Sequence, residues 1–196
     1  MCSPILGNIY LHYALDTWFE DIVRTHSKGA AYMVRYADDS VFCFQYEEDA
    51  KRFYRTLIKR LAKYNLEVAE EKTKLIKLNK VDDDDNDGNG NMPDKTFDFL
   101  GFTHYVGKDK DGRKRVKRKT SKKKYKASLL KFKIWIQENR HIPTKELMKK
   151  LNAKVIGNMR YYGITDNHRA VSNFVNEIMK LLYKWLNRRS QRKSLE

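Results

Sequence analysis

The sequence of 196 residues predicts an α+β fold, in which an antiparallel sheet with helices on one face precedes an all-helical module of about three helices. Apolar and aromatic runs flank a short polar break near residue 38, as in a β-hairpin. Apolar residues also recur at helical spacing early in the chain and again after residue 120. The charge shifts from 16 basic and 20 acidic residues in 1–112 to 25 basic and 5 acidic in 113–196.

The N-terminal part is expected to form a helix, a hairpin, a second helix and a strand. Apolar spacing predicts a helix over 9–26, which packs under a hairpin over 32–44. Glu47 begins the second helix, because anionic side chains are favoured at a helix N-terminus, and this helix should end near Asn65. A charged turn then leads to a short strand over 74–78.

Asp38 and Asp39 stand side by side at the tip of the predicted hairpin. Adjacent carboxylates repel each other, so a divalent cation that neutralises both suits this position. Mg²⁺ is the expected ion, because it is often held by few protein carboxylates. A polar turn is the alternative, since Asp is common in turns. Cys43 is interpreted as a buried strand thiol, and with Cys2 it has neither a zinc spacing nor a disulfide framework.

Residues 79–95 are rich in Asp, Asn and Gly and predict a disordered loop. Part of this loop matches a calcium-loop pattern at Asp83, Asp85, Asp87, Gly88 and Asp94. We reject a calcium site, because Glu is absent at the last position and strands rather than helices flank the segment. An aromatic strand follows at 97–102, and Lys110-Asp111-Gly112 predicts the turn to a basic returning strand over 113–119.

The chain after Thr120 predicts three amphipathic helices, whose apolar stripes are interpreted as ordinary core positions. We expect a domain boundary near residues 117–121. It divides the chain into a domain of residues 1–117, which includes a hairpin at 97–117, and a helical domain of residues 118–196.

The strongest charge feature is a run of basic side chains between residues 113 and 126 that no acid interrupts. It contains Arg113, Lys114, Arg115, Lys117, Arg118, Lys119, Lys122, Lys123, Lys124 and Lys126. Unrelieved repulsion in such a run favours a polyanion, and nucleic acid is the preferred partner. A solvated charged face is the alternative. Tyr125, Tyr161 and Tyr162 could stack on unpaired bases, although core packing explains the last two at least as well.

The chain has no run of 18 apolar residues and no signal peptide pattern. We therefore expect it inside the cell, in a bacterial cytoplasm or an organelle, and without a membrane partner. A basic membrane-surface protein is a weak alternative for a net charge of +16, because the helices are expected to bury their apolar faces internally.

An ordered series of short motifs runs along the chain. It consists of Ser3-Pro4-Ile5-Leu6, Asn8-Ile9-Tyr10-Leu11, Tyr36-Ala37-Asp38-Asp39, Glu71-Lys72-Thr73 and Phe99-Leu100-Gly101-Phe102. It continues with Tyr161-Tyr162-Gly163 and Leu186-Asn187-Arg188-Arg189-Ser190-Gln191-Arg192. The series resembles group II intron reverse transcriptase/maturases over nearly the whole chain. The resemblance implies a partial reverse-transcriptase palm followed by a helical thumb, or domain X.

The resemblance implies roles for the matching residues of the palm. Asp38 and Asp39 correspond to its metal-binding pair, and Tyr36 and Ala37 lie beside the primer end and the incoming nucleotide. Lys72 corresponds to the lysine proposed to protonate or neutralise the leaving pyrophosphate. A solvated lysine in a charged turn explains Lys72 equally well.

Two further sets of residues follow from the same resemblance. A primer-gripping hairpin is implied at Phe99, Leu100 and Gly101, with an ordinary strand as the alternative. RNA-binding residues of the thumb are implied at Arg188, Arg189 and Arg192.

The family's further palm aspartate and its Gln-Gly pair have no counterpart in this sequence, which starts at Met1-Cys2-Ser3. A two-ion transfer needs ligands from a second strand, so we expect the isolated chain to polymerise poorly or not at all. We also expect it to self-associate through exposed palm surface.

The expected function is that of an RNA-directed DNA polymerase (reverse transcriptase) and intron maturase. The resemblance implies that it binds group II intron RNA and, in the complete protein, extends a DNA primer with dNTPs by using two Mg²⁺ ions. The alternative is a non-catalytic RNA-binding module that assists group II intron splicing.

Overall fold

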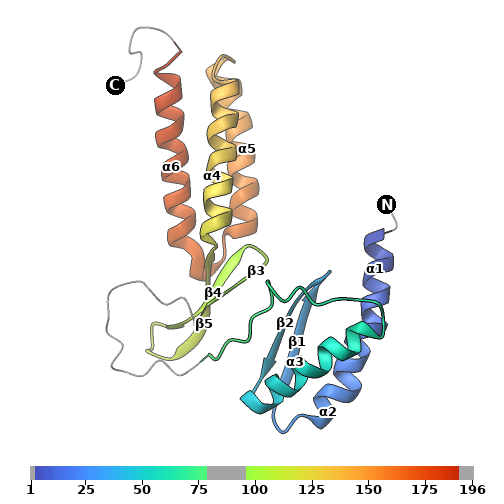
Figure 1. The fold of residues 1–196 in the computed structure, drawn as a ribbon. Coiled ribbons are helices and arrows are strands. Elements are labelled where there is room, and N and C mark those ends of the chain that lie inside the picture. Colours follow the sequence, from blue (N-terminus) through green and yellow to red (C-terminus); the bar gives the residue numbers. More distant parts are fainter. Residues whose placement is uncertain (1–2, 79–95, 190–196) are drawn as a thin grey trace. The chain divides into compact units, whose positions relative to one another are not determined.

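The structure is a computed structural model that describes residues 3–78 and 96–189 (Figure 1). The chain divides into two compact units, Met1–Asn79 and Lys80–Glu196, and each has its own hydrophobic core. Helices and antiparallel sheets are both present, which confirms the predicted fold class. The predicted loop of 79–95, with its calcium-like pattern, lies outside the described residues.

A long helical segment opens the first unit. It consists of α1 (Ser3–Leu11), the π-helical turns η1 (His12–Asp16) and η2 (Phe19–Val23), and α2 (Arg24–His26). The segment starts earlier than the predicted helix of 9–26. Proline is tolerated in a first helical turn, where its missing N–H has no intrahelical partner to lose, and so Pro4 does not prevent the earlier start.

The predicted hairpin is present as strands β1 (Ala31–Tyr36) and β2 (Asp39–Phe44), which pair in antiparallel register. Its inner face packs on the helices of the same unit. The ring of Phe42 lies 4.5 Å from that of Phe53 and 5.5 Å from that of Phe19, which is fully buried. This aromatic packing fixes the register, since a slip by one residue would turn these side chains toward solvent.

The opposite face of the hairpin is open within residues 3–78. Tyr32 and Tyr36 are exposed on it, as is Cys43, which pairs with Tyr32. The interpretation of Cys43 as a buried thiol is therefore wrong. Side chains alternate along a strand, and because Phe42 and Phe44 take core positions, Cys43 points the other way.

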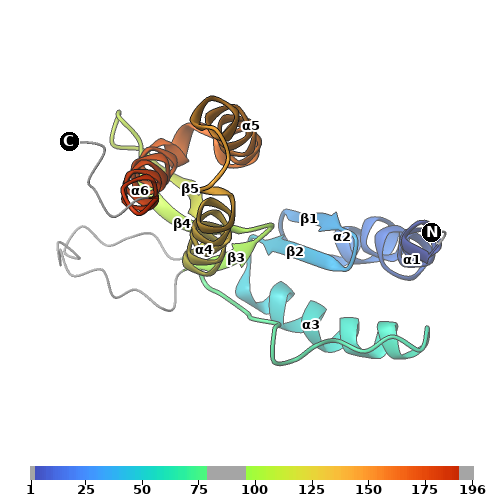
Figure 2. The same ribbon diagram turned by 90° about the horizontal axis from the view of Figure 1, so that it is seen from above.

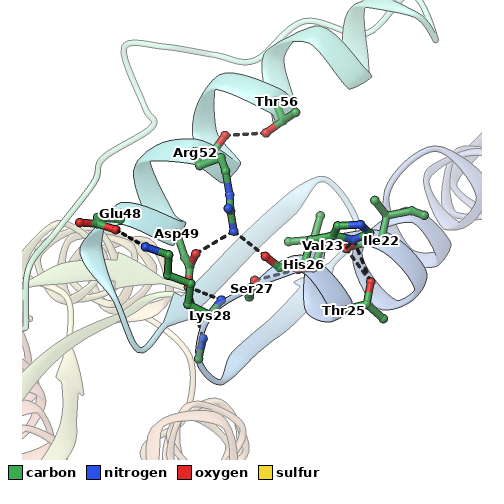
Figure 3. Close-up of polar contacts among 11 residues, drawn as sticks. Ile22, Val23, Thr25, His26, Ser27, Lys28, Glu48, Asp49, Arg52 and Thr56 are labelled. Carbon is green, nitrogen blue, oxygen red and sulfur yellow. Dashed lines mark hydrogen bonds and ion pairs between the residues drawn. The ribbon is translucent and has the colours of Figure 1, made fainter.

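Helix α3 (Glu47–Ala62) is tied to the connection before β1 by the buried carboxylate of Asp49, which is 2% exposed. Asp49 accepts hydrogen bonds from the Lys28 amide at 2.9 Å and from Arg52 at 2.8 Å. Figure 3 shows Arg52 also reaching the carbonyl oxygen of His26. These bonds hold the turn between α2 and β1 against the first turn of α3, where a carboxylate also suits the helix dipole.

The prediction of a strand over residues 74–78 is wrong. This segment forms neither strand nor helix, and Leu75 and Leu78 are exposed. A strand needs a partner for its backbone groups, and within residues 3–78 the sheet consists of β1 and β2 alone. An ion pair between Lys77 and Glu47, at 3.1 Å, instead joins the segment to the start of α3.

The second unit contains a three-stranded antiparallel sheet in the order β3-β4-β5. Its strands are β3 (Phe97–Phe99), β4 (Phe102–Lys108) and β5 (Lys114–Thr120). The aromatic segment predicted as one strand over 97–102 is thus divided by a tight turn. The predicted hairpin turn at 110–112 is confirmed, and Gly112 has the positive φ of 75° that favours glycine there.

Three helices follow and lie side by side, as Figure 2 shows end-on. They are α4 (Lys122–Asn139), α5 (Thr144–Tyr162) and α6 (His168–Leu186), with a short 3-10 turn, η3 (Thr165–Asn167), before α6. The predicted module of about three helices is confirmed.

The core of this bundle is built from the predicted apolar stripes. Its buried residues are Ile136, Leu147, Leu151, Phe174, Ile178 and Leu182. Tyr125 packs edge-on against Phe174, with ring centroids 5.4 Å apart, so the ring of Tyr125 contributes to the core of the bundle.

Strand β5 belongs to the same compact unit as the helices, whereas the sequence predicts a boundary near 117–121. The physical reason is Asn167, which is 1% exposed. Asn167 accepts a hydrogen bond from the Thr120 amide and donates to the Thr120 hydroxyl and the Tyr162 carbonyl, each at 2.8 Å. One side chain therefore joins β5 to the end of α5.

Candidate metal site and nucleic-acid interface

Asp38 and Asp39 lie at the tip of the β1–β2 hairpin, and both are exposed. Because Tyr36 pairs with Asp39, the tip is a two-residue loop of Ala37 and Asp38. Ala37 has a φ of 53°, in the left-handed region. That conformation costs about 1–2 kcal/mol for a residue with a Cβ and persists only where neighbouring contacts hold it.

Arg35 supplies such contacts. Its Nη1 donates to the Ala37 carbonyl and to Asn8 Oδ1 of α1, each at 2.9 Å. Its Nε and Nη2 donate to the two carboxylate oxygens of Asp16, at 2.7 and 2.6 Å. These side chains are 12% and 21% exposed, and a two-bond ion pair with so little exposure is well ordered. Arg35 therefore links the hairpin tip to α1 and η1.

The charge state of Asp16 follows from the same contacts. Burial raises the pKa of Asp16, but the hydrogen bond and charge of Arg35, together with His12 at 3.4 Å, outweigh burial and leave the pKa below its usual value. The hydrogen bond to Asp16 likewise raises the pKa of Arg35. The ion pair under the hairpin tip is therefore fully charged at neutral pH.

The hairpin tip offers the oxygen ligands that Mg²⁺ prefers, but few of them. Within 3–78 and 96–189, no three His, Cys, Asp or Glu side chains come together in a way that could hold a metal ion. A two-ion site needs further ligands to fix the spacing of the ions, so these residues do not fit such a site by themselves. Lys72 is exposed, and no hydrogen bond or ion pair of the described residues joins it to Asp38 or Asp39.

The turn between β3 and β4 brings Leu100 and Gly101 against the end of α5. Both have positive φ, at 49° and 80°. The Tyr161 hydroxyl donates to the Leu100 carbonyl at 2.9 Å. A Cβ on Gly101 would lie 3.1 Å from the hydroxyl oxygen of Tyr162, whose ring packs on Phe102 at 5.3 Å. The turn that resembles a primer grip is therefore fastened to the helical bundle.

The basic run of residues 113–126 is almost entirely exposed. Nine of its ten basic side chains are exposed, and Lys117 is half-buried. Asp166 lies 2.6 Å from Arg115 and 3.8 Å from Arg118, and the carboxylate of Asp109 accepts a hydrogen bond from the Arg113 amide at 2.8 Å. A surface with this excess of positive charge attracts polyanions.

The first turn of α4 concentrates this charge. Ser121 caps the helix, with its hydroxyl 3.4 Å from the Lys124 amide, and Lys122–Lys124 follow directly. The helix has no acid in its first turn and no base in its last. The helix dipole favours the opposite arrangement, by roughly 0.3–1 kcal/mol per charge. Residues that oppose local stability in this way are expected at functional sites.

Two of the arginines assigned to the thumb lie at the other end of the bundle. Arg188 lies over the ring of Trp185, with its guanidinium carbon 5.2 Å from the ring centroid. Arg189 donates to the Ile142 carbonyl at 2.7 Å, in the connection between α4 and α5. Arg192 lies outside the described residues.

Arg35 and its partner are not among the functional residues that the sequence patterns predict. A usable signal is present, because alternation along β1 places Arg35 on the same face as Ala31 and Met33, where a charged group needs a partner. The identity of that partner, Asp16, has no comparable local signal. The same holds for Asn167, whose contacts come from distant parts of the chain.

Comparisons with known families agree with this architecture. Residues 1–104 match the family described as reverse transcriptase (RNA-dependent DNA polymerase), and residues 125–196 match the group II intron, maturase-specific domain. The first match covers more than half of the chain, which therefore belongs to the reverse transcriptase family. Both matches together identify a group II intron reverse transcriptase/maturase, as the resemblance predicts.

A comparison with curated proteins found no match to this chain. Among the helices of 3–78 and 96–189, none is both long and apolar enough to cross a membrane.

Proposed function

We propose that this chain binds group II intron RNA through the basic run of β5 and α4, and that it supplies the Asp38–Asp39 hairpin tip to an RNA-directed DNA polymerase. The maturase-specific match supports intron RNA as the partner. The observation that carries the RNA-binding part is the set of three lysines in the first turn of α4, where the dipole disfavours them.

The basic run suits the RNA backbone. Lysine and arginine side chains bind phosphates and release condensed counterions, so binding of this kind weakens steeply as salt rises. The exposed side chains come from β5 and from the adjoining turn of α4, which Ser121 connects directly. Phosphates held there would also meet the positive end of the helix dipole at the start of α4.

The polymerase part is supported by the reverse transcriptase match and by the exposed aspartates. A divalent ion at the tip would neutralise charge on the transferred phosphate. Asp38 and Asp39 would hold the ion, and Arg35 would keep the tip in its strained conformation. A non-catalytic RNA-binding module is the second candidate. It is favoured by the lack of a third metal-ligating side chain at the tip among the described residues.

Two variants separate these functions. Lys122→Gln/Lys123→Gln/Lys124→Gln should weaken binding of a folded intron RNA by about tenfold or more, measured by fluorescence anisotropy at fixed salt. Asp38→Asn/Asp39→Asn should bind RNA at least as tightly as the parent chain, because it removes negative charge. Equal affinities of the lysine variant and the parent chain would contradict RNA binding by this run.

Primer extension on a primed RNA template with dNTPs and Mg²⁺ tests the polymerase part. It is measured with a reverse-transcriptase palm segment added to supply the further metal ligands, because Asp38 and Asp39 do not fit a two-ion site by themselves. Extension by this complemented protein that Asp38→Asn/Asp39→Asn abolishes would support the polymerase part. Intact RNA binding without extension by the complemented protein would support the non-catalytic module.

A further inference from the structure

Asp166 is an acidic side chain that faces the basic run from within the fold. It lies in η3, and its side chain is 8% exposed. Arg115 Nη2 donates a hydrogen bond to Asp166 Oδ1 at 2.6 Å, and Arg118 Nη2 lies 3.8 Å from Oδ2. Both arginines belong to β5, and Arg115 precedes Asp166 by 51 residues. One carboxylate therefore takes up charge from two arginines of the basic run.

Two other acids of this unit are placed differently. Glu146 pairs with Lys150 and Glu177 pairs with Lys180, each about one turn along the same helix, and the two carboxylate side chains are 51% and 42% exposed. Solvent screens exposed pairs of this kind, so they have little effect on groups around them. Asp166 is shielded from solvent, and its charge therefore acts more strongly on its neighbours.

The backbone beside Asp166 is fastened to β5. Asn167 is 1% exposed, and it bonds to the amide and hydroxyl of Thr120 and to the Tyr162 carbonyl, each at 2.8 Å. Because η3 is held in this way, the carboxylate has little freedom to move when an anion approaches the two arginines. The arginine side chains remain 50% and 47% exposed, so a phosphate can still reach them.

A fixed carboxylate at this position opposes a second anion. A phosphate that binds Arg115 or Arg118 competes with Asp166 for the N–H donors of the guanidinium, and the two negative charges repel each other. No ion pair of the described residues joins Lys122–Lys124 to a carboxylate. The basic run therefore has a part on β5 that Asp166 restrains and a part on α4 that it does not.

We propose that Asp166 limits phosphate binding by Arg115 and Arg118, so that the lysines of α4 make the primary contact with RNA. This inference rests on the proposed RNA-binding function and adds to it a residue that sets the affinity of the same site. A charge that every incoming phosphate has to overcome also disfavours polyanions that make few other contacts.

The first test is Asp166→Asn, which removes the charge and keeps the size of the side chain. Its affinity for a folded intron RNA, measured by fluorescence anisotropy on the full chain, should rise by about fivefold at fixed salt. The slope of log K against log salt should increase in magnitude by roughly 1–2, because up to two arginines become available to phosphates. A carboxylate with a purely structural role, or one that orders the arginines for RNA, would give unchanged or weaker binding, and either result refutes the proposal.

The matched control is Glu177→Gln, which changes the net charge equally at an exposed pair with Lys180. It should change the affinity by less than about twofold, because its charge is screened. An equal gain in Glu177→Gln and Asp166→Asn would show a general effect of net charge and would refute a specific role of Asp166.

A second comparison asks whether the gain passes through the arginines. Asp166→Asn/Arg115→Gln should lose most of the gain, whereas Asp166→Asn/Lys180→Gln, which has the same net charge, should keep it. Equal affinities of the two double variants would contradict the proposal.

Circular dichroism and thermal unfolding show whether each variant is folded at the temperature of the binding measurement. Asp166→Ser removes the same charge and provides the test if Asp166→Asn does not fold. Failure of the proposed function gives a different result, because Lys122→Gln/Lys123→Gln/Lys124→Gln then leaves the affinity for RNA unchanged. If the role of Asp166 alone is wrong, the lysine variant still weakens binding and Asp166→Asn does not strengthen it.

Discussion

The carboxylate of Asp16 accepts two hydrogen bonds from the guanidinium of Arg35, at 2.7 and 2.6 Å, directly beneath the strained tip of the aspartate hairpin. The same guanidinium holds the carbonyl of Ala37 at 2.9 Å. The position of Asp38 and Asp39 therefore depends on an ion pair between Arg35 of β1 and Asp16 of η1. The two strands of the hairpin do not provide this ion pair by themselves. This dependence can be measured through stability and its response to pH.

Asp16→Asn should reduce the free energy of unfolding at pH 7 by about 2 kcal/mol, because it leaves a mostly buried guanidinium without its charge partner. The pKa of Asp16 is lowered in the folded protein, so its contribution is present above the unfolded pKa of about 3.9 and is lost as pH falls through the folded pKa. Urea unfolding should show a constant difference between the two proteins from pH 7 to about pH 5, and a difference that shrinks as the pH falls below about 3.9 toward 3. A difference that stays constant down to pH 3 would contradict this assignment.

Asp49→Ala should destabilise the first unit by about 2–4 kcal/mol, because it leaves the Lys28 amide and Arg52 without their acceptor. Glu48→Ala is the matched control. Glu48 pairs with Lys28 at the surface, where solvent screens the charges, so the loss of this pair should cost much less than the loss of Asp49. Urea unfolding curves of both variants provide the comparison, and similar losses would show that Asp49 is not the anchor of this connection.

Gly101→Ala should destabilise the second unit more than Gly112→Ala does. Both glycines have positive φ, at 80° and 75°, so both substitutions add similar backbone strain of about 1 kcal/mol. A Cβ at position 101 also meets the Tyr162 hydroxyl oxygen at 3.1 Å, whereas nothing lies within 4 Å at position 112. Equal shifts of the unfolding midpoint in the two variants would rule out the close contact between the β3–β4 turn and α5.

Lys123→Glu should stabilise the protein while it weakens RNA binding. Reversing a charge in the first turn of α4 relieves the conflict with the helix dipole, by about 0.5–1 kcal/mol. Lys131→Glu, in the middle of the same helix, should change stability much less, because the effect of the dipole is confined to the helix ends. Thermal unfolding and RNA titration on both variants check the two expectations, and a loss of stability in Lys123→Glu would contradict the first.

Local sequence patterns predicted those parts of the fold that depend on neighbouring residues. The hairpin around Asp38, the anionic start of α3 at Glu47 and the apolar stripes of the bundle all follow from spacing within one element. The prediction of a strand over 74–78 was wrong because a strand forms only where a partner strand elsewhere in the chain can pair with it. The outward direction of Cys43 depends on which neighbours reach the core.

In the candidate sites, too, the locally encoded features could be predicted from the sequence, whereas the contacts between distant residues could not. Asp38 and the basic run are visible as local chemistry, and the structure places both at the surface. The contacts that support them join residues far apart in the chain, such as Arg35 with Asp16 and Asn167 with Thr120. No spacing rule within a single element reveals such pairs.

The salt dependence of RNA binding tests the central claim most directly. The affinity of the parent chain for a folded intron RNA should fall linearly in log K against log salt, with a slope set by the number of phosphates contacted. Lys122→Gln/Lys123→Gln/Lys124→Gln should lower the magnitude of that slope by about 2–3, while Asp38→Asn/Asp39→Asn leaves it unchanged. A slope that is the same in the lysine variant and the parent chain would contradict RNA recognition by the basic run.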